Sequence, residues 1–201
     1  MIHLILDYGN KVLPPASLLR DVIYALQGVD TDTISFTNDR FEIRENFDVP
    51  NRLRDIVSYL GECGWLYRKL RNFLSNRPSG LVAQAFCCSI EKELDEYIKL
   101  LSVLDSQQLP QSAQDQRQLS LHRLLVWLHE PRQRLIVLGI LVDIVNGDNK
   151  QPLCGGAICS ALHKCSASGG PFVSGIVTHI TEEVILFFLI FVFRLLSLFM
   201  K

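Results

Sequence analysis

The sequence has almost no net charge, which argues against functions that depend on a strong electrostatic field. Its 201 residues contain 20 lysines and arginines against 21 aspartates and glutamates, so the formal net charge is -1 at pH 7. Domains that bind polyanions normally present a clear excess of basic side chains. We therefore expect no nucleic acid among the partners.

The chain also lacks the short motifs that carry nucleotide or metal chemistry. Neither GxxxxGK[ST] nor GxGxxG occurs, and the adjacent thiols Cys87-Cys88 have no nearby histidine or basic cluster to activate them. A possible zinc-ligand set contains no CxxC pair and crowds into one helix-like stretch, so we favour a packed helix with buried thiols over a zinc-dependent enzyme. This set is Cys154, Cys159, His163 and Cys165. We expect no cofactor, no metal and no enzymatic activity.

A secretory signal is not predicted at the start of the sequence. The apolar run of residues 2–6 has no basic residue before it and ends at Asp7. Most of the six cysteines stand among leucines and alanines, which is typical of buried thiols in a reducing compartment. A cytoplasmic location is the simpler interpretation.

The chain is rich in apolar residues that recur at helical spacing. The first predicted helix begins at Pro14-Pro15 with Ser17 as its N-cap, and it ends at Gly28, a glycine just past the last periodic residue. Two β-branched and aromatic runs then flank a turn-forming Asn-Asp pair. They predict a small β-hairpin near residues 33–43.

Two long helices follow the hairpin. The first has Pro50 in its first turn and ends near Ser75, although Gly61 and Gly64 each weaken it by up to about 1 kcal/mol relative to alanine. The second, from Leu81 to about Leu104, has apolar residues every three or four positions and a mixed-sign opposite face. Both patterns predict amphipathic helices, each of which packs against the rest of the protein through one apolar stripe.

The remainder of the chain continues the helical pattern after a break. Residues 105–118 are rich in Gln, Ser and Pro and predict a linker. A helix over 119–129 is expected to break at Pro131, and another follows over 132–145. The last predicted helices are Gly155 to Ala167 and one that starts near Phe172. The fold class is therefore mainly α: an elongated bundle of antiparallel helices with at most one hairpin.

The C-terminal stretch 184–200 is apolar on all faces, and Arg194 is its only charge. As a membrane anchor it is at the lower limit of length, and Arg194 costs about 2.5–3.5 kcal/mol near the bilayer centre. As a helix in water it needs further chain or a partner to cover it. We favour an alternative terminus over a membrane anchor, and a tail-anchored helical adaptor stays as the rival hypothesis.

Taken in order, several of these segments resemble the first conserved region of the gamma-tubulin complex component family. The resemblance covers roughly residues 17 to 180, and a set of ordered blocks is more specific than a lone motif. The blocks are LLRDVIYALQGVDTDTISF, LGECGWLYRKLRNF, GLVAQAFCCSIEKELDEYIKLLSVLDSQ, LSLHRLLVWLHEPRQRLIVLGILVD and GGAICSALHKCSASGGPFV.

The resemblance implies a helical rod that packs laterally against sister components and supports microtubule nucleation at a centrosome or spindle pole. In the family, a separate C-terminal half holds gamma-tubulin, so we expect this chain to lack that half and to meet gamma-tubulin indirectly. We divide the chain into a family-like region, 1–180 with its linker at 105–118, and a divergent apolar tail, 181–201.

A basic and aromatic stretch supplies the candidate residues for such lateral contacts. Large protein interfaces are anchored by aromatic and arginine side chains. Single-stranded nucleic acid is the less favoured partner for this stretch, because the chain has no positive net charge. For Trp65 alone, simple core packing is the favoured alternative. The candidate interface residues are Trp65, Tyr67, Arg68 and Arg71.

Overall fold

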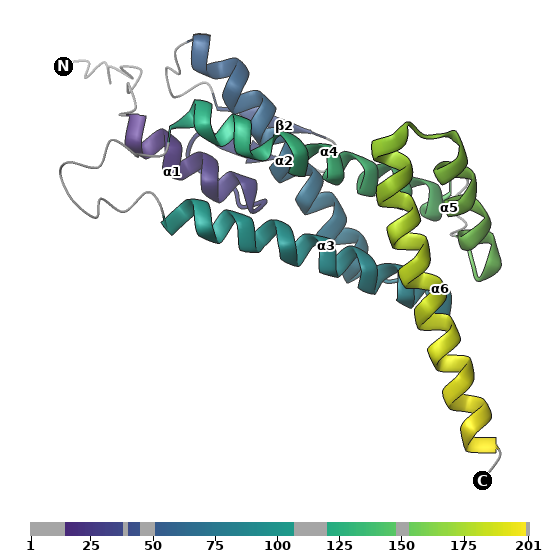
Figure 1. Ribbon diagram of the computed structural model, residues 1–201. Coiled ribbons are helices and arrows are strands. Elements are labelled where there is room, and N and C mark those ends of the chain that lie inside the picture. Colours follow the sequence, from purple (N-terminus) through teal and green to yellow (C-terminus); the bar gives the residue numbers. More distant parts are fainter. Residues whose placement is uncertain (1–14, 38–39, 45–50, 107–119, 148–152, 200–201) are drawn as a thin grey trace, which may run out of the picture. The chain divides into compact units, whose positions relative to one another are not determined.

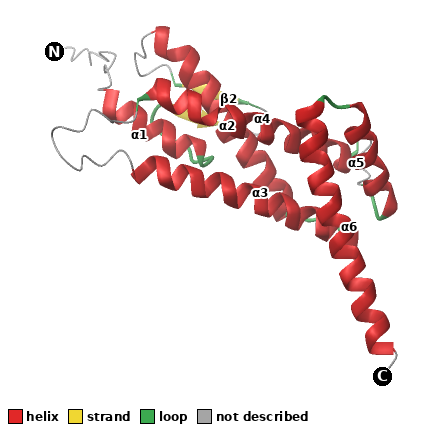
Figure 2. Ribbon diagram, in the orientation of Figure 1, coloured by secondary structure: helices red, strands yellow, loops and turns green. Residues whose placement is uncertain are grey.

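The computed structural model describes residues 15–37, 40–44, 51–106, 120–147 and 153–199. These residues form helices and one two-stranded antiparallel sheet, which confirms the predicted mainly α class with a single small hairpin (Figures 1 and 2). In chain order the elements are α1 (Pro15–Leu26), β1 (Ile34–Phe36), β2 (Phe41–Ile43), α2 (Asn51–Ser75), α3 (Leu81–Ser106), α4 (Leu121–Asn146), α5 (Gly156–Ser168) and α6 (Pro171–Phe199).

The chain divides into two compact units. The first contains Met1–Trp65 and Leu104–Leu128, and so includes α1, the hairpin, the start of α2 and the start of α4. The second contains Leu66–Val103 and His129–Lys201, and so includes the end of α2, most of α3, the rest of α4, α5 and α6.

In the first unit, α1 ends in a glycine-capped turn. Gly28 has φ 72°, a left-handed conformation that glycine adopts without a Cβ penalty. The Gly28 N–H donates to the carbonyl of Ala25 (2.8 Å), and the Val29 N–H donates to the carbonyl of Tyr24 (3.4 Å). This pair of bonds is the Schellman arrangement, so the predicted stop at Gly28 is confirmed.

Two side-chain hydrogen bonds attach the hairpin to the chain that precedes it. The buried Thr33 hydroxyl donates to Asp21 Oδ2 of α1 (3.0 Å), and the Phe36 N–H donates to Asp30 Oδ1 (2.7 Å). Phe36 lies opposite Phe41 in the antiparallel register, with ring centroids 6.5 Å apart. The hairpin is thus held by satisfied polar groups as well as by packed rings.

Two glycines of α2 allow close packing in the first unit. A Cβ at Gly64 would collide with the carbonyl group of Ala25 and with the ring of Phe36, and a Cβ at Gly61 would lie 2.7 Å from the ring of Phe41. Both glycines lower helix propensity, as the sequence indicated. In the structure this loss is compensated, because the absence of a side chain at both positions lets the end of α1 and the hairpin pack against α2.

In the second unit, α3 supplies a continuous buried stripe. Its buried side chains recur every three or four residues: Phe86, Ile90, Leu94, Tyr97 and Leu101. The ring of Phe73 from α2 packs edge-on against Phe86, with centroids 6.2 Å apart. The predicted amphipathic α3 is confirmed.

The helices α5 and α6 pack side by side in the second unit (Figure 1). α5 buries Ile158 and Leu162, which are one turn apart, and its other residues are mostly small. Small side chains let helix backbones approach closely. Hydroxyl groups meet across the pair, with Ser166 Oγ 2.9 Å from Thr178 Oγ1.

Two sequence predictions about helix ends are wrong. Ser17 is not the N-cap, because α1 begins at Pro15, a residue favoured in the first turn. Pro131 does not break the chain into two helices, because it lies inside the continuous α4. A proline removes one backbone hydrogen bond, and the buried apolar residues on both sides of it outweigh that loss.

Two other predicted features fall partly outside the described residues. The structure describes the predicted linker only at 105–106, where α3 is still helical, and it does not describe the hairpin turn at 38–39.

Replacing Gly64 by alanine tests the close approach in the first unit. We expect Gly64→Ala to lower the free energy of unfolding by about 1–3 kcal/mol, because the new methyl group meets backbone atoms that cannot move aside. Gly175→Ala in α6 is the matched control. Its Cβ would have nothing within 4 Å, so it should stabilise by up to about 1 kcal/mol. Urea denaturation followed by circular dichroism measures both, and equal stabilisation by the two variants would contradict the packing.

Candidate protein-interaction surfaces

The four candidate interface residues of α2 differ in their exposure. Trp65, Tyr67 and Arg68 are half-buried, whereas Arg71 is exposed. The Tyr67 ring lies 5.7 Å from the ring of buried Tyr97, so part of this side chain serves the core of the second unit. Their role in binding a partner stays a prediction.

The basic character of this stretch is partly neutralised within the second unit. Lys69, which lies between Arg68 and Arg71, forms an ion pair with Asp143 of α4 through a 2.7 Å Nζ–Oδ2 contact. The exposed guanidinium of Arg71 is therefore the member of the set best placed to meet an acidic partner.

A second surface, which the sequence analysis missed, lies at the start of α4 in the first unit. Leu121, Leu124 and Leu128 form the buried stripe of this segment, so the residues between them face away from the core. Trp127 is 54% exposed and Val126 is 74% exposed. Large exposed apolar side chains next to each other are typical of binding surfaces. The three- and four-residue leucine spacing was the available signal, because it leaves Val126 and Trp127 off the stripe.

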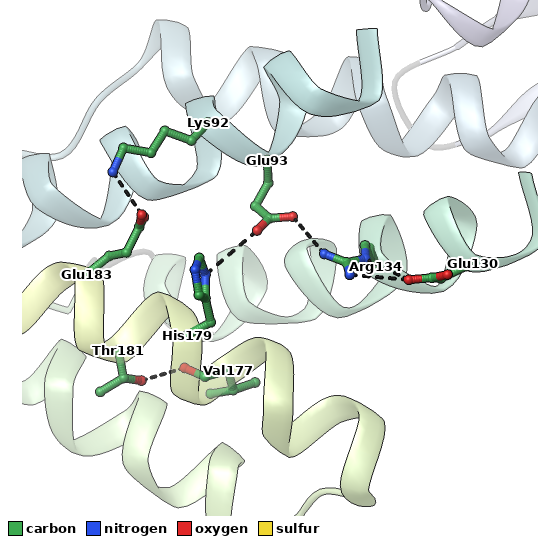
Figure 3. Close-up of polar contacts among 8 residues, drawn as sticks. All are labelled: Lys92, Glu93, Glu130, Arg134, Val177, His179, Thr181 and Glu183. Atoms are coloured by element: carbon green, nitrogen blue, oxygen red, sulfur yellow. Dashed lines mark hydrogen bonds and ion pairs between the residues drawn. The ribbon is translucent and has the colours of Figure 1, made fainter. Parts of the chain in front are cut away.

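A charged cluster joins three helices of the second unit (Figure 3). The Glu93 carboxylate of α3 lies between Arg134 of α4, at 3.5 Å, and His179 of α6, at 3.9 Å. Arg134 also pairs with Glu130 one turn earlier on α4, at 3.2 Å. The Glu93 side chain is only 14% exposed, so this carboxylate is a structural contact rather than a solvated charge.

A second ion pair connects α3 to α6. Lys92 Nζ lies 2.8 Å from Glu183 Oε1. Burial alone would raise the pKa of Glu183, but hydrogen bonds from Lys92 and Ser89, with the charges of Lys92 and His179, outweigh burial and lower that pKa below its ordinary 4.5. The carboxylate therefore stabilises the fold above its ordinary pKa, and this contribution is lost as the pH falls through the lower folded value.

The proposed thiol and imidazole ligands lie at and within α5. Cys154 and His163 are exposed, and Cys159 and Cys165 are half-buried. In the part of the chain that the structure describes, no group of three or more His, Cys, Asp or Glu side chains is arranged to hold a metal ion. The expectation of buried thiols is wrong for this helix, because Ile158 and Leu162 occupy its buried face instead.

The adjacent pair Cys87-Cys88 behaves as the sequence predicted, with one thiol in the core and one at its boundary. Cys87 is buried and Cys88 is half-buried. Burial raises the pKa of the Cys87 thiol to about 11, with smaller raising contributions from Cys88 and Glu91 and an opposing one from Arg77. The reactive thiolate form of Cys87 is therefore scarce at neutral pH.

Comparison with known proteins gives a consistent result. Residues 19–196 match the family model described as "Gamma tubulin complex component N-terminal". The chain is 35% identical over 187 residues to gamma-tubulin complex component 3 of Homo sapiens, covering 88% of this chain and 20% of that protein. It is 36% identical over 171 residues to the Arabidopsis thaliana protein of the same name, covering 78% of this chain and 20% of that protein.

A more distant relative carries a spindle pole name. The chain is 29% identical over 230 aligned positions to spindle pole body component 98 of Dictyostelium discoideum, covering 88% of this chain and 28% of that protein. The chain thus spans between 20% and 28% of the length of these curated relatives.

The Lys92–Glu183 pair predicts a pH-dependent loss of stability. Glu183→Gln should lower the free energy of unfolding by up to about 1 kcal/mol at neutral pH, because it removes one exposed ion pair. The difference from the unchanged protein should vanish as the pH falls through the lowered pKa of Glu183. Glu182→Gln, at the exposed neighbouring position, is the control and should have little effect. A Glu183→Gln difference that stays constant into acid would contradict this role of the carboxylate.

The cysteine environments predict an order of chemical modification. With a small disulfide reagent at neutral pH, exposed Cys154 should react well before Cys87, which should react only after unfolding in urea. Mass spectrometry of the modified chain at successive times measures this order. Cys154→Ser should remove the fastest phase, and early labelling of Cys87 would show that its thiol is not held in the core.

Proposed function

The chain belongs to the gamma-tubulin complex component family, and on that premise we propose that it is a non-catalytic structural component of the gamma-tubulin complex that supports microtubule nucleation. The observation that carries the proposal is the extent of the family match, which runs from α1 through most of α6. A short motif can arise by chance, whereas a match over residues 19–196 includes both compact units.

The packing within each unit suits a scaffold. In the first unit the glycines of α2 admit the end of α1 and the hairpin, and in the second unit Glu93 connects α3 to α4 and α6. Interior packing of this kind resists compression and transmits load between contacts. The chain therefore acts by holding neighbours at fixed positions rather than by transforming a substrate.

Lateral contacts with sister components are the means of assembly. Tryptophan, tyrosine and arginine side chains contribute most to such interfaces. Among the described residues of the first unit, Trp127 offers the largest exposed aromatic surface, and Arg71 with half-buried Arg68 offers positive charge in the second unit. Gamma-tubulin is reached through the assembled complex.

Location follows from the proposed assembly. The chain resides in the cytoplasm and at the microtubule-organising centre, which is the centrosome or the spindle pole. The relatives named as spindle pole body components support this placement.

A direct binding experiment tests the lateral contacts. The purified chain should bind the N-terminal region of a different gamma-tubulin complex component, with the affinity measured by isothermal titration calorimetry. Trp127→Ala should weaken binding at least tenfold, because loss of an interface anchor costs about 2 kcal/mol or more. The double reversal Arg68→Glu with Arg71→Glu should weaken it too, and more strongly at low salt.

Matched controls separate interface loss from general damage. Phe172→Ala removes an exposed aromatic residue elsewhere, and Arg54→Glu reverses an exposed arginine nearer the start of α2. Both should bind as the unchanged chain does. The proposal fails if no sister component binds, and the named anchors are wrong if binding is unaffected by either test variant.

A further inference from the structure

The hydrogen-bond pattern of the hairpin shows which backbone groups point away from it. Bonded and non-bonded residue pairs alternate along two antiparallel strands. The pair at the end away from the turn is bonded, because the Arg44 N–H donates to the Thr33 carbonyl (2.9 Å). Ile43 comes next along β2, so its pair with β1 is a non-bonded one, and the same holds for Phe41. The N–H and carbonyl groups of Phe41 and Ile43 therefore point outward from β2.

The opposite edge of the sheet, along β1, is closed by the residues that precede this strand. The Ile34 N–H donates to Thr31 Oγ1 (3.0 Å), and the Thr31 N–H donates to the Ile34 carbonyl (2.8 Å). The Phe36 N–H donates to Asp30 Oδ1 (2.7 Å). The chain thus satisfies the outward groups of β1 with its own backbone and side chains.

The outer edge of β2 has no such closure. Among the described residues, no group bonds to the outward N–H and carbonyl groups of Phe41 and Ile43. The strand is nevertheless held in place, because the Phe41 ring lies against α2. The side chains of Arg40, Glu42 and Arg44, on and beside this strand, are exposed. A fixed row of unpaired backbone groups is a template for a further strand.

The backbone groups determine the kind of partner that this edge can bind. An extended peptide offers N–H and carbonyl groups at the spacing of a strand. A helix uses its backbone groups internally and cannot supply them along its length. The partner is therefore an extended segment of a protein.

The exposed charges determine the sequence of that segment. Side chains directly opposite each other on neighbouring strands interact, so acidic residues are favoured opposite Arg40 and Arg44, and a basic residue opposite Glu42. The Arg40–Glu42 ion pair (3.0 Å) is exposed and leaves both charges open to a partner. The positions between them lie beside half-buried Phe41 and Ile43, where apolar side chains fit.

The same charges disfavour a second copy of this chain as the partner. If β2 paired with β2 of another copy so that Phe41 faced Ile43, Arg40 would face Arg44 and Glu42 would face its own counterpart. Like charges directly opposite each other destabilise a pair of strands. A register shifted by two residues avoids these contacts, but it leaves only one of the two open residues opposite a residue of β2.

We propose that the outer edge of β2 binds an extended segment of another protein, with residues in the order acidic, apolar, basic, apolar, acidic. The segment adds an antiparallel third strand to the sheet. Backbone hydrogen bonds to Phe41 and Ile43 hold it, and carboxylates opposite Arg40 and Arg44 set its register. The edge uses none of the residues assigned above to lateral contacts, so this inference does not rest on the proposed function.

A synthetic peptide tests the edge directly. A fluorescein-labelled peptide containing Asp-Val-Lys-Val-Asp is titrated with the full chain and followed by fluorescence anisotropy. It should bind saturably, and Lys-Val-Asp-Val-Lys should bind at least about tenfold more weakly, because its charges oppose like charges of the edge. The first peptide N-methylated at both valines should not bind, because it lacks the donors that face β2.

Charge reversal on the chain identifies the register. Arg44→Glu should weaken binding of the first peptide, and Lys-Val-Lys-Val-Asp should restore it, because the start of an antiparallel peptide lies opposite the end of β2. Recovery by Asp-Val-Lys-Val-Lys instead would overturn the antiparallel pairing. Arg54→Glu, which reverses an exposed arginine of α2, is the matched control and should bind as the unchanged chain does.

Amide hydrogen exchange shows whether the edge is open before the peptide binds. The amides of Phe41 and Ile43 should exchange quickly in the free chain and at least about tenfold more slowly with saturating peptide, whereas the bonded amide of Arg44 should change little. The proposal is overturned if the first two amides are already protected in the free chain, by its own residues or by self-association. It is also overturned if no peptide binds or if both charge patterns bind equally.

Discussion

Burial of one apolar stripe along each helix is the constraint on which the structure depends. α3 shows it most fully, because its buried residues from Phe86 to Leu101 form the centre of the second unit. The other contacts depend on this packing. The T-shaped contact of Phe73 with Phe86 lies on the stripe, and the carboxylates of Glu93 and Glu183 lie at its edge, where lysine, arginine and histidine can reach them.

The same constraint separates structural surface from binding surface. Where a helix keeps a polar face, as α3 does, its exposed side is a solvated surface with ion pairs. Where large apolar side chains lie off the buried stripe, the protein presents something for another molecule to cover. This occurs locally at Val126 and Trp127 of α4, and over residues 185–191 of α6. A scaffold that binds its neighbours needs exposed apolar patches such as the one at Val126 and Trp127.

The helices and the hairpin could be predicted because their signals are local. Apolar spacing, the glycine at 28 and the β-branched runs around residues 34–43 each act within a few residues. The predictions failed where long-range packing decides. Pro131 stays inside α4 because buried residues flank it, and the thiols of α5 stay outside the core because Ile158 and Leu162 occupy it. The role of Gly64 and the contact of Glu93 with α4 and α6 depend on residues far away in the chain, so no local pattern indicated them. The exposure of Trp127 had a visible signal in the leucine spacing that the sequence analysis did not use.

We propose that this chain is a building block of the gamma-tubulin complex. The most direct measurement is to express the tagged chain in cells, capture it under gentle conditions and identify the proteins recovered with it by mass spectrometry. We expect other gamma-tubulin complex components to be enriched over a control carrying the tag alone. Their absence from the captured material, with the chain itself folded and abundant, would contradict it.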